Sequence, residues 1–415
     1  MYPPCPGGGH HSRGPHPRGG PREHPGRPGG HSRGLLEGFG TTGAALGERG
    51  RPVRRWWAAL LFPSLLWAAA GDELRLGREV VPVSETIELR LDPADSTYTG
   101  AVAISLWVVE STRNFRFHAK ELSIEKVELR GGGGLVPLHW VVGQAGLVEV
   151  STDVALTPTS QYELRIEFSN NFDTRALGLY RVETRGRAYL FTQFEAWYAR
   201  QAFPCWDEPS FKIPYQFVLR VPDGLLALTN TPVQEEQVAA GWRELTFKKT
   251  PPLPSYLLAL AVGPLEEVTI PGLSVPGQVV TTAGNTSLAA EAVRLAPPVL
   301  QALEQYFGSA YPYEKLALIG VPEFMPGAME NPGAVTFRDE ILLLDSRAAS
   351  PAQRQRLGLI MTHELAHMWF GDLVTMAWWD DLWLNESFAD WLAYKLGDEL
   401  FPEYGIGITE LQDVQ

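Results

Sequence analysis

Two histidines and two glutamates near the carboxyl end of the chain have the types and the spacing of a metal site. Residues 363–367 read His-Glu-Leu-Ala-His, and eighteen residues separate His367 from Glu386. On a helix, residues four apart share one face, so His363 and His367 can bind one metal ion from the same side. Glu364 lies one step around that helix, where its carboxylate can reach a water at the metal but not the metal itself.

Zinc is the metal that this set of ligands favours, and we expect one ion per chain. Two imidazoles and one carboxylate that leave a fourth position open are typical of catalytic zinc. Such an ion lowers the pKa of a bound water to about 7 and polarises a carbonyl group. The short H-E-x-x-H pattern also arises by chance, and the downstream Glu386 is what favours a real site.

The first element that must position these residues is a helix over about 351–370. Ser350 has the character of an N-cap, Pro351 suits the first helical position, and Gln353 completes a capping box. Gly371 suits a position just past the carboxyl end, so we expect the helix to stop near it. Apolar residues at helical spacing predict its core-facing side: Leu357, Ile360, Met361, Ala366 and Trp369.

A second helix is expected from about Asp381 to Lys395, with Gly397 after it. This helix carries Glu386 to the metal. Asp390 lies one turn further on, where its carboxylate could accept a hydrogen bond from a ligand histidine and fix the tautomer of that ring. A solvated position on the helix surface explains Asp390 equally well, so both interpretations stay open.

The amino-terminal 71 residues have the composition of a leader and not of a folded domain. Residues 1–50 are rich in Gly, Pro, Arg and His, which predicts disorder. In residues 51–71 a pair of arginines precedes an apolar run, 56–70, that ends in Ala-Ala-Ala, as in a secretory signal peptide. We expect a secreted or periplasmic protein without stable membrane insertion after cleavage. The alternative is an uncleaved membrane anchor through residues 56–70.

The remaining chain predicts an α+β protein of two domains. Short alternating segments around 87–91, 102–108, 161–168 and 214–221 indicate an all-β domain over residues 72–266. Residues 267–415 mix predicted helices, such as 288–307, with buried strands at 315–321 and 334–337. The chain has a formal net charge of -13, which argues against nucleic acid as a partner.

Three motifs in this order resemble the M1 zinc aminopeptidases, the gluzincin group. They are Thr-Gln-Phe-Glu at 192–195 with the following Arg200 and 202–209, then Gly-Ala-Met-Glu-Asn at 327–331, then H-E-x-x-H with the distant glutamate. The stretch 369–386 looks most like the bacterial alanyl aminopeptidase N branch. The resemblance implies a saddle-shaped β domain followed by a thermolysin-like α/β catalytic domain, which is incomplete in this chain.

The resemblance also implies a role for each motif residue. His363, His367 and Glu386 would be zinc ligands, and Glu364 would be the general base. Glu195 and Glu330 would hold the amino terminus of a peptide substrate, which is largely protonated at neutral pH. The rest of the pocket would be formed by Gln193, Gly327, Ala328, Met329 and Asn331. The implied reaction is removal of the first residue from peptides that have a free amino terminus.

Two other functions remain open at the level of sequence. One is an aminopeptidase with an added epoxide hydrolase activity, although that branch resembles Gly-Gly-Met-Glu-Asn and this chain has Ala328. The other is a binding protein that keeps the scaffold without catalysis, against which the complete set of motif residues speaks. The chain extends 29 residues past Glu386, to Gln415. Relatives carry an oxyanion-binding tyrosine and a helical domain further on, so we expect a truncated protein of weak activity and low solubility.

Overall fold

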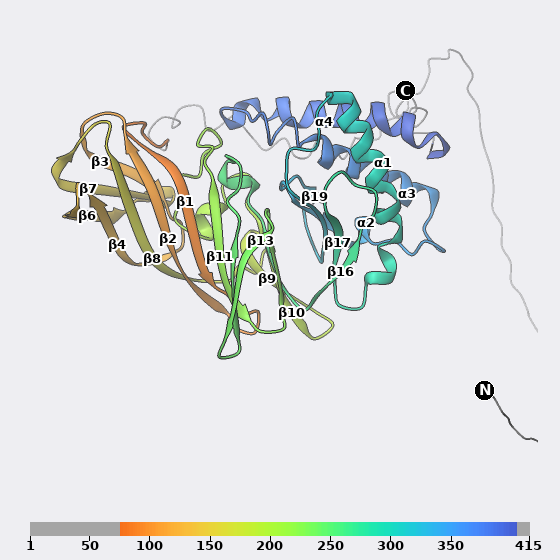
Figure 1. Ribbon diagram of the computed structural model, residues 1–415, viewed down its shortest axis with the longest axis horizontal. Coiled ribbons are helices and arrows are strands. Elements are labelled where there is room, and N and C mark those ends of the chain that lie inside the picture. The colour runs from red at the N-terminus through yellow and green to blue at the C-terminus, as the bar shows by residue number, and fades with distance from the viewer. Residues whose placement is uncertain (1–74, 405–415) are drawn as a thin grey trace, which may run out of the picture. The chain divides into compact units, whose positions relative to one another are not determined.

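The computed structural model describes residues 75–404, and the predicted leader and signal segment lie outside that range. Within it, the α+β order predicted from the sequence is confirmed: a β-rich amino-terminal region precedes a region of mixed strands and helices (Figure 1). Among the described helices, none is long and apolar enough to cross a membrane.

Three sheets make up the β-rich region. The largest has eight strands in the order β13 (Val233–Ala239), β14 (Trp242–Phe247), β11 (Tyr215–Pro222), β1 (Val80–Arg90), β2 (Thr97–Val108), β8 (Gln161–Asn171), β4 (Ser123–Gly131) and β5 (Gly134–Val136). A three-stranded sheet contains β3 (Thr112–His118), β7 (Leu147–Leu156) and β6 (Leu138–Val142). A four-stranded sheet contains β12 (Leu226–Thr229), β15 (Leu260–Gly263), β10 (Arg187–Gln193) and β9 (Gly178–Thr184).

Alternating apolar residues build these sheets, as their pattern in the sequence predicts. In β1, Ile87 and Leu89 are fully or almost fully buried. Their neighbours on the other face are half-buried or exposed. Since side chains alternate between the faces of a strand, Glu85 shares the buried face with these two residues. Its carboxylate is 1% exposed, and neither of its oxygens has a hydrogen-bond partner in the described part of the chain.

The second region begins where the chain changes sheets, between Gly263 and Leu265. Its five strands follow the order β16 (Leu265–Thr269), β17 (Gly277–Thr282), β18 (Leu316–Val321), β20 (Ala334–Arg338) and β19 (Ala328–Met329). The pairs β17–β18 and β18–β20 are parallel, and β19 pairs antiparallel with β20. The short strand β19, which the sequence did not predict, holds the 327–331 motif at the edge of this sheet.

Four α-helices accompany this sheet: α1 (Ala290–Phe307), α2 (Asp339–Leu342), α3 (Pro351–Ala366) and α4 (Trp383–Leu400). Figure 1 shows α1, α2 and α3 gathered beside the five-stranded sheet, with α4 extending along the top of the view. Single turns of 3-10 helix are η3 (Gln144–Gly146), η4 (Ala199–Gln201), η5 (Ser255–Leu257), η6 (Thr286–Leu288), η7 (Trp379–Asp381) and η8 (Pro402–Tyr404). Helix α1 ends at Gly308, whose φ of 64° suits glycine.

The predicted carboxyl ends of both metal-site helices were wrong. Helix α3 ends at Ala366 and not near Gly371, because Met368 and Trp369 donate to carbonyls three residues back, which tightens the chain out of the α-helix. Helix α4 continues through Gly397 to Leu400. The buried Phe401 donates its backbone N–H to the carbonyl of Gly397 and so closes that last turn.

Replacing Glu85 with glutamine should flatten part of the dependence of stability on pH. Burial, and secondly the charge of Asp207, raise the pKa of Glu85 well above its usual value. The folded chain therefore holds this proton more tightly than the unfolded chain, whose pKa is about 4.3. The stability that the proton contributes is complete below that pH and is lost as the pH rises through the folded pKa.

Urea unfolding of wild type and Glu85→Gln between pH 5 and pH 8 measures this effect. As the pH rises through that window, the free energy of unfolding of wild type should fall relative to that of the variant. We expect the difference to grow by up to about 1.4 kcal/mol for each pH unit. Glu244→Gln, at an exposed position on β14, is the matched control and should run parallel to wild type. Parallel curves for Glu85→Gln as well would contradict the buried, protonated carboxyl.

The capping box predicted at the start of α3 is present. The Ser350 hydroxyl accepts from the backbone N–H of Gln353 at 3.2 Å, and the Gln353 side chain accepts from the backbone N–H of Ser350 at 2.9 Å. We expect Ser350→Ala to lower the free energy of unfolding by about 1 kcal/mol, and Ser350→Gly to cost only a few tenths. Equal losses in both variants, measured by urea unfolding, would argue against a capping role.

Candidate active site

Helices α3 and α4 bring the three predicted metal ligands together. The Nε2 atoms of His363 and His367 lie 3.0 Å apart, and Glu386 Oε2 lies 3.4 Å from the first and 3.8 Å from the second. One ligand atom from each residue fits within 4.8 Å of the others. His367 is fully buried, whereas the Glu386 side chain is 40% exposed. The cluster is therefore open on one side.

Hydrogen bonds at the opposite nitrogens orient both imidazole rings. His363 Nδ1 lies 2.9 Å from Asp390 Oδ1, and His367 Nδ1 lies 3.0 Å from the backbone carbonyl oxygen of Phe370. Both partners are acceptors, so each Nδ1 carries a proton and each Nε2 faces the cluster. Two Nε2 atoms 3.0 Å apart need a proton or a metal cation between them, since two bare lone pairs at that distance repel each other. The donor set therefore fits a metal ion, and imidazole with carboxylate suits zinc.

A second group of carboxylates adjoins the first and shares Glu386. Ligand oxygens of Glu195, Glu330 and Glu386 lie within 4.8 Å of one another. Glu195 follows β10 in the four-stranded sheet, and Glu330 follows β19 at the edge of the five-stranded sheet. The group therefore spans both regions of the fold, with a concentration of negative charge that favours a cationic ligand.

The pKa values of these acids shift in different directions, because burial and neighbouring carboxylates raise them whereas neighbouring histidines lower them. Burial first, and then the neighbouring carboxylates, raise the pKa of Glu195 and of Glu364 well above the usual value, and burial raises that of Glu330. Glu386 is also penalised by burial, but the hydrogen bond from His363 and the charge of His367 lower its pKa to about 2. Of these four acids, only Glu386 has a lowered pKa, which suits a metal ligand, whereas Glu195, Glu330 and Glu364 hold protons more tightly than free carboxylates do.

The remaining predicted pocket residues divide into two groups. Gln193 and Met329 are buried beside each other, with Gln193 Nε2 3.5 Å from the Met329 sulfur, and Gln193 Oε1 has no hydrogen-bond partner among the described residues. Ala328 is half-buried. Asn331, in contrast, already donates to the carbonyls of Leu257 and Leu258 and accepts from Thr336. Its amide therefore holds the motif loop in place.

An ion pair between Arg200 and Asp207 holds the stretch that follows Glu195. Arg200 Nε donates to Asp207 Oδ2 at 2.7 Å, and its Nη2 donates to the Asp207 carbonyl. Ser255 donates to the other carboxylate oxygen of Asp207. This buried ion pair closes the turn that follows Glu195. By closing this turn, the ion pair restricts the backbone that carries Glu195. Neither of its two charged side chains has to contact a ligand for this role.

Sequence reasoning missed Tyr256, which contacts the residue before Glu386, and the Phe370 carbonyl, which contacts His367. Tyr256 is 1% exposed; its hydroxyl lies 3.4 Å from Asn385 Nδ2 on α4, and its ring packs edge-on against Trp379. The Phe370 carbonyl orients His367. The Phe370 carbonyl could not be predicted, because every residue has a backbone carbonyl. Tyr256 could not be predicted either, because the prolines before it and the leucines after it form no metal-site motif.

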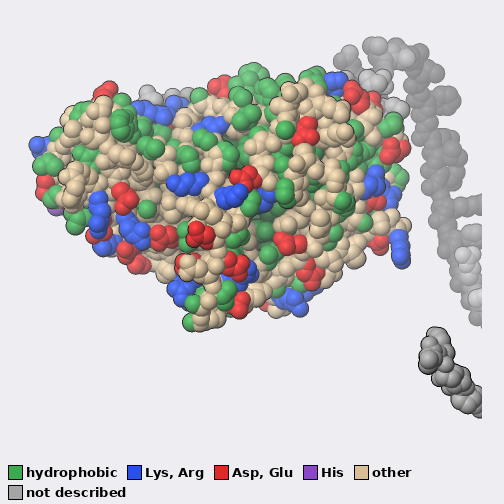
Figure 2. Space-filling view, viewed as in Figure 1, with side chains coloured by type: hydrophobic (Ala, Val, Ile, Leu, Met, Phe, Trp, Pro, Cys, Tyr) green, Lys and Arg blue, Asp and Glu red, His purple; other side chains and the backbone are tan. Residues whose placement is uncertain are grey.

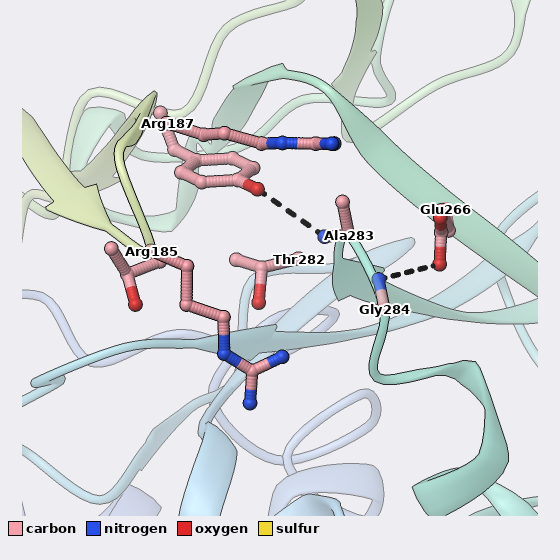
Figure 3. Close-up of a pocket in the computed structure, with 8 residues that line it drawn as sticks. Arg185, Arg187, Glu266, Thr282, Ala283 and Gly284 are labelled. Atoms are coloured by element: carbon pink, nitrogen blue, oxygen red, sulfur yellow. Dashed lines mark hydrogen bonds between the residues drawn. The ribbon is translucent and has the colours of Figure 1, made fainter.

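A separate pocket of about 320 Å³ lies between the turn of the β9–β10 hairpin and strand β17 (Figure 3). Figure 3 shows the Arg185 and Arg187 side chains at its rim, with Glu266 accepting from the backbone N–H of Gly284. None of the predicted site residues lines it. With a single carboxylate and no histidine in its lining, this pocket offers no set of metal ligands, so the chemistry lies with the cluster on α3 and α4.

Comparison with known proteins agrees with this assignment. The family model of the peptidase M1 N-terminal domain matches residues 81–257, and that of the peptidase family M1 domain matches residues 291–414. Together the two matches leave only short segments of the described chain uncovered. The chain belongs to peptidase family M1.

Named relatives are aminopeptidases of plants and archaea. The chain is 36% identical over 339 residues to aminopeptidase M1-B of Oryza sativa subsp. japonica, covering 80% of this chain and 38% of that protein. It is 35% identical over 346 residues to aminopeptidase M1 of Arabidopsis thaliana, covering 80% and 39%. It is 40% identical over 243 residues to probable aminopeptidase 1 of Sulfurisphaera tokodaii, covering 58% and 31%. The chain thus spans less than two fifths of the length of these relatives.

Proposed function

We propose that this chain forms the catalytic centre of a zinc aminopeptidase, which removes the first residue from peptides with a free amino terminus. The observation that carries the proposal is the shared Glu386. It belongs both to the group with His363 and His367 and to the group with Glu195 and Glu330. A metal-binding group and an ammonium-binding group that meet at one residue place the first peptide bond of a substrate beside the metal.

Each residue of the site has a task in this reaction. His363, His367 and Glu386 would hold the metal ion, which when bound supplies Lewis acidity and lowers the pKa of a water to about 7. Glu364 accepts the proton of the attacking water and passes it to the leaving amine. Asp390 and the Phe370 carbonyl keep the two imidazoles in the tautomer that binds a metal.

Glu195 and Glu330 anchor the substrate. A protonated α-amino group would neutralise the excess of buried negative charge between Glu195 and Glu330. Because this anchor is fixed, only the bond that follows the first residue reaches the metal. Figure 2 shows basic and acidic side chains interspersed on the face that it presents. That nucleic acid is not a partner stays a prediction from the formal net charge of -13.

The alternative functions gain no support of their own. Within residues 75–404, the complete set of acids and histidines lies together, which is more than a binding scaffold without catalysis needs. Among the described residues, no contact distinguishes a site for epoxide hydrolysis from one for peptides. Export of the protein stays a prediction from residues 51–71, to be tested by amino-terminal sequencing of material from the native host.

We expect one zinc ion per chain, lost when both histidines are replaced. Elemental analysis of the purified wild type should give a stoichiometry near one. A His363→Ala, His367→Ala double variant should retain almost none, because a single carboxylate cannot hold zinc against dialysis. Glu364→Gln is the control: it should keep its zinc while turnover falls by about 10²–10⁴-fold. Undiminished zinc in the double variant would show that the metal site is elsewhere.

Cleavage should depend strictly on a free amino terminus. A peptide and its N-acetylated form, assayed side by side by mass spectrometry, differ only in the charge that Glu195 and Glu330 would bind. We expect cleavage of the free peptide alone, and an increase in its KM in Glu330→Gln. Cleavage of both peptides at similar rates would identify an endopeptidase.

A further inference from the structure

One lysine of the β-rich region hydrogen-bonds to the segment that joins the two metal-site helices. Lys212 lies just before β11, and its Nζ donates to the carbonyl oxygens of Asp372 and Leu373, at 2.8 and 3.0 Å. It also lies 2.9 Å from the hydroxyl oxygen of Thr375. An ammonium group has three donors, so every donor of Lys212 is used on this one short segment.

The lysine projects from a rigid part of the β-rich region. Its neighbours Phe211 and Ile213 are both 4% exposed, and Ile213 exchanges backbone hydrogen bonds with Leu253. Burial lowers the pKa of Lys212, with the charge of Asp372 acting in the opposite direction. The position of the ammonium is therefore set by the packing of the β-rich region.

The segment that Lys212 binds forms the turn around His367. The backbone N–H of Asp372 donates to the His367 carbonyl at 3.0 Å, and the Thr375 hydroxyl donates to the Gly371 carbonyl at 2.6 Å. Within this same turn, the Phe370 carbonyl accepts from His367 Nδ1. Movement of the turn would move that carbonyl, and with it the direction of the His367 Nε2 lone pair.

His363 is oriented independently. Its partner Asp390 lies on α4 and has a side chain that is 66% exposed, outside the turn that Lys212 binds. The two imidazoles therefore depend on different supports. Loss of the Lys212 contacts should disturb His367 and leave His363 in place.

We propose that Lys212 is a positioning residue, which fixes the turn 370–375 so that the Phe370 carbonyl aims His367 at the metal. The inference rests on the proposed zinc site. The inference also gives the β-rich region a part in metal binding. Through Lys212, that region would influence the affinity of the site for zinc. Replacement of the partners that orient metal ligands typically weakens metal binding by about 10–100-fold.

The test measures the dissociation constant for zinc, by competition with a chelator, for the whole chain and its variants. Lys212→Met keeps the length of the side chain and removes the three donors, so we expect a dissociation constant about 10–100-fold higher. Lys248→Met is the matched control, because Lys248 pairs with Glu314 on the surface. That variant should bind zinc as wild type does.

A spectroscopic measurement separates positioning from general loss of stability. In the Co²⁺-substituted protein, proton NMR resolves the exchangeable Nδ1–H of each ligand histidine. We expect Lys212→Met to speed exchange of one such proton, that of His367, and to leave the other unchanged. Equal effects on both signals, or on neither, would overturn the proposal.

Thr375→Val removes one of the three contacts of Lys212. This variant replaces Lys212→Met in the zinc-binding measurement if Lys212→Met does not fold. It should raise the dissociation constant several-fold, and the double variant should fall short of the product of the two single effects, because both act on one turn. Unchanged zinc affinity in Lys212→Met, or in Thr375→Val where only that variant folds, overturns the inference alone. Failure of the wild type to bind zinc would instead overturn the proposed function, and the inference with it.

Discussion

Buried negative charge is the constraint on which this site depends. Glu195, Glu330, Glu364 and Glu386 lie close enough to influence one another, and burial penalises the charge on each of them. Isolated carboxylates in such surroundings take up protons, whereas carboxylates beside cations stay ionised. The fold gathers more acids here than its own cations neutralise. That excess favours positive ligands, and the proposed binding of a metal ion and an ammonium group rests on it.

Holding such a cluster together requires support from many directions. Helix α3 supplies two imidazoles on one face, and α4 supplies Glu386 and Asp390 one turn apart. Glu330 comes from the edge of the five-stranded sheet and Glu195 from the other region of the fold. The contacts that fix these elements are mostly neutral or distant from the ligands, as with the buried pair of Arg200 and Asp207. The repulsion at the centre is thus opposed by packing and hydrogen bonds at the periphery.

The sequence predicted those parts of the site that depend on local spacing. The i, i+4 histidines and the capping box at Ser350 follow from helix geometry, and the structure has both. The sequence left the role of Asp390 open, and in the structure its carboxylate lies 2.9 Å from His363 Nδ1. It also predicted the α+β order, because alternation and helical periodicity are local patterns. The helix ends were predicted less well, because a glycine is only a local signal, whereas turn geometry ends α3 before Gly371 and packing carries α4 past Gly397.

What the sequence could not predict was contact between segments far apart in the chain. Lys212 and Tyr256 have unremarkable neighbours, and their relevance comes from the residues 372–375 and 379–385 that the fold brings to them. The Phe370 carbonyl is invisible to residue types because every residue has one. The burial of Glu85 was equally hidden, although its place in the alternation of β1 carried the necessary signal.

The division of the cluster between both regions of the fold also orders events during synthesis of the chain. Glu195 leaves the ribosome 191 residues before Glu386, and the β-rich region can fold while the later helices are still being made. Until α4 emerges, the nascent chain has Glu195 and Glu330 but lacks Glu386, the residue that the two groups share. The two groups of the proposed site can therefore join only after the last of these residues has been synthesised.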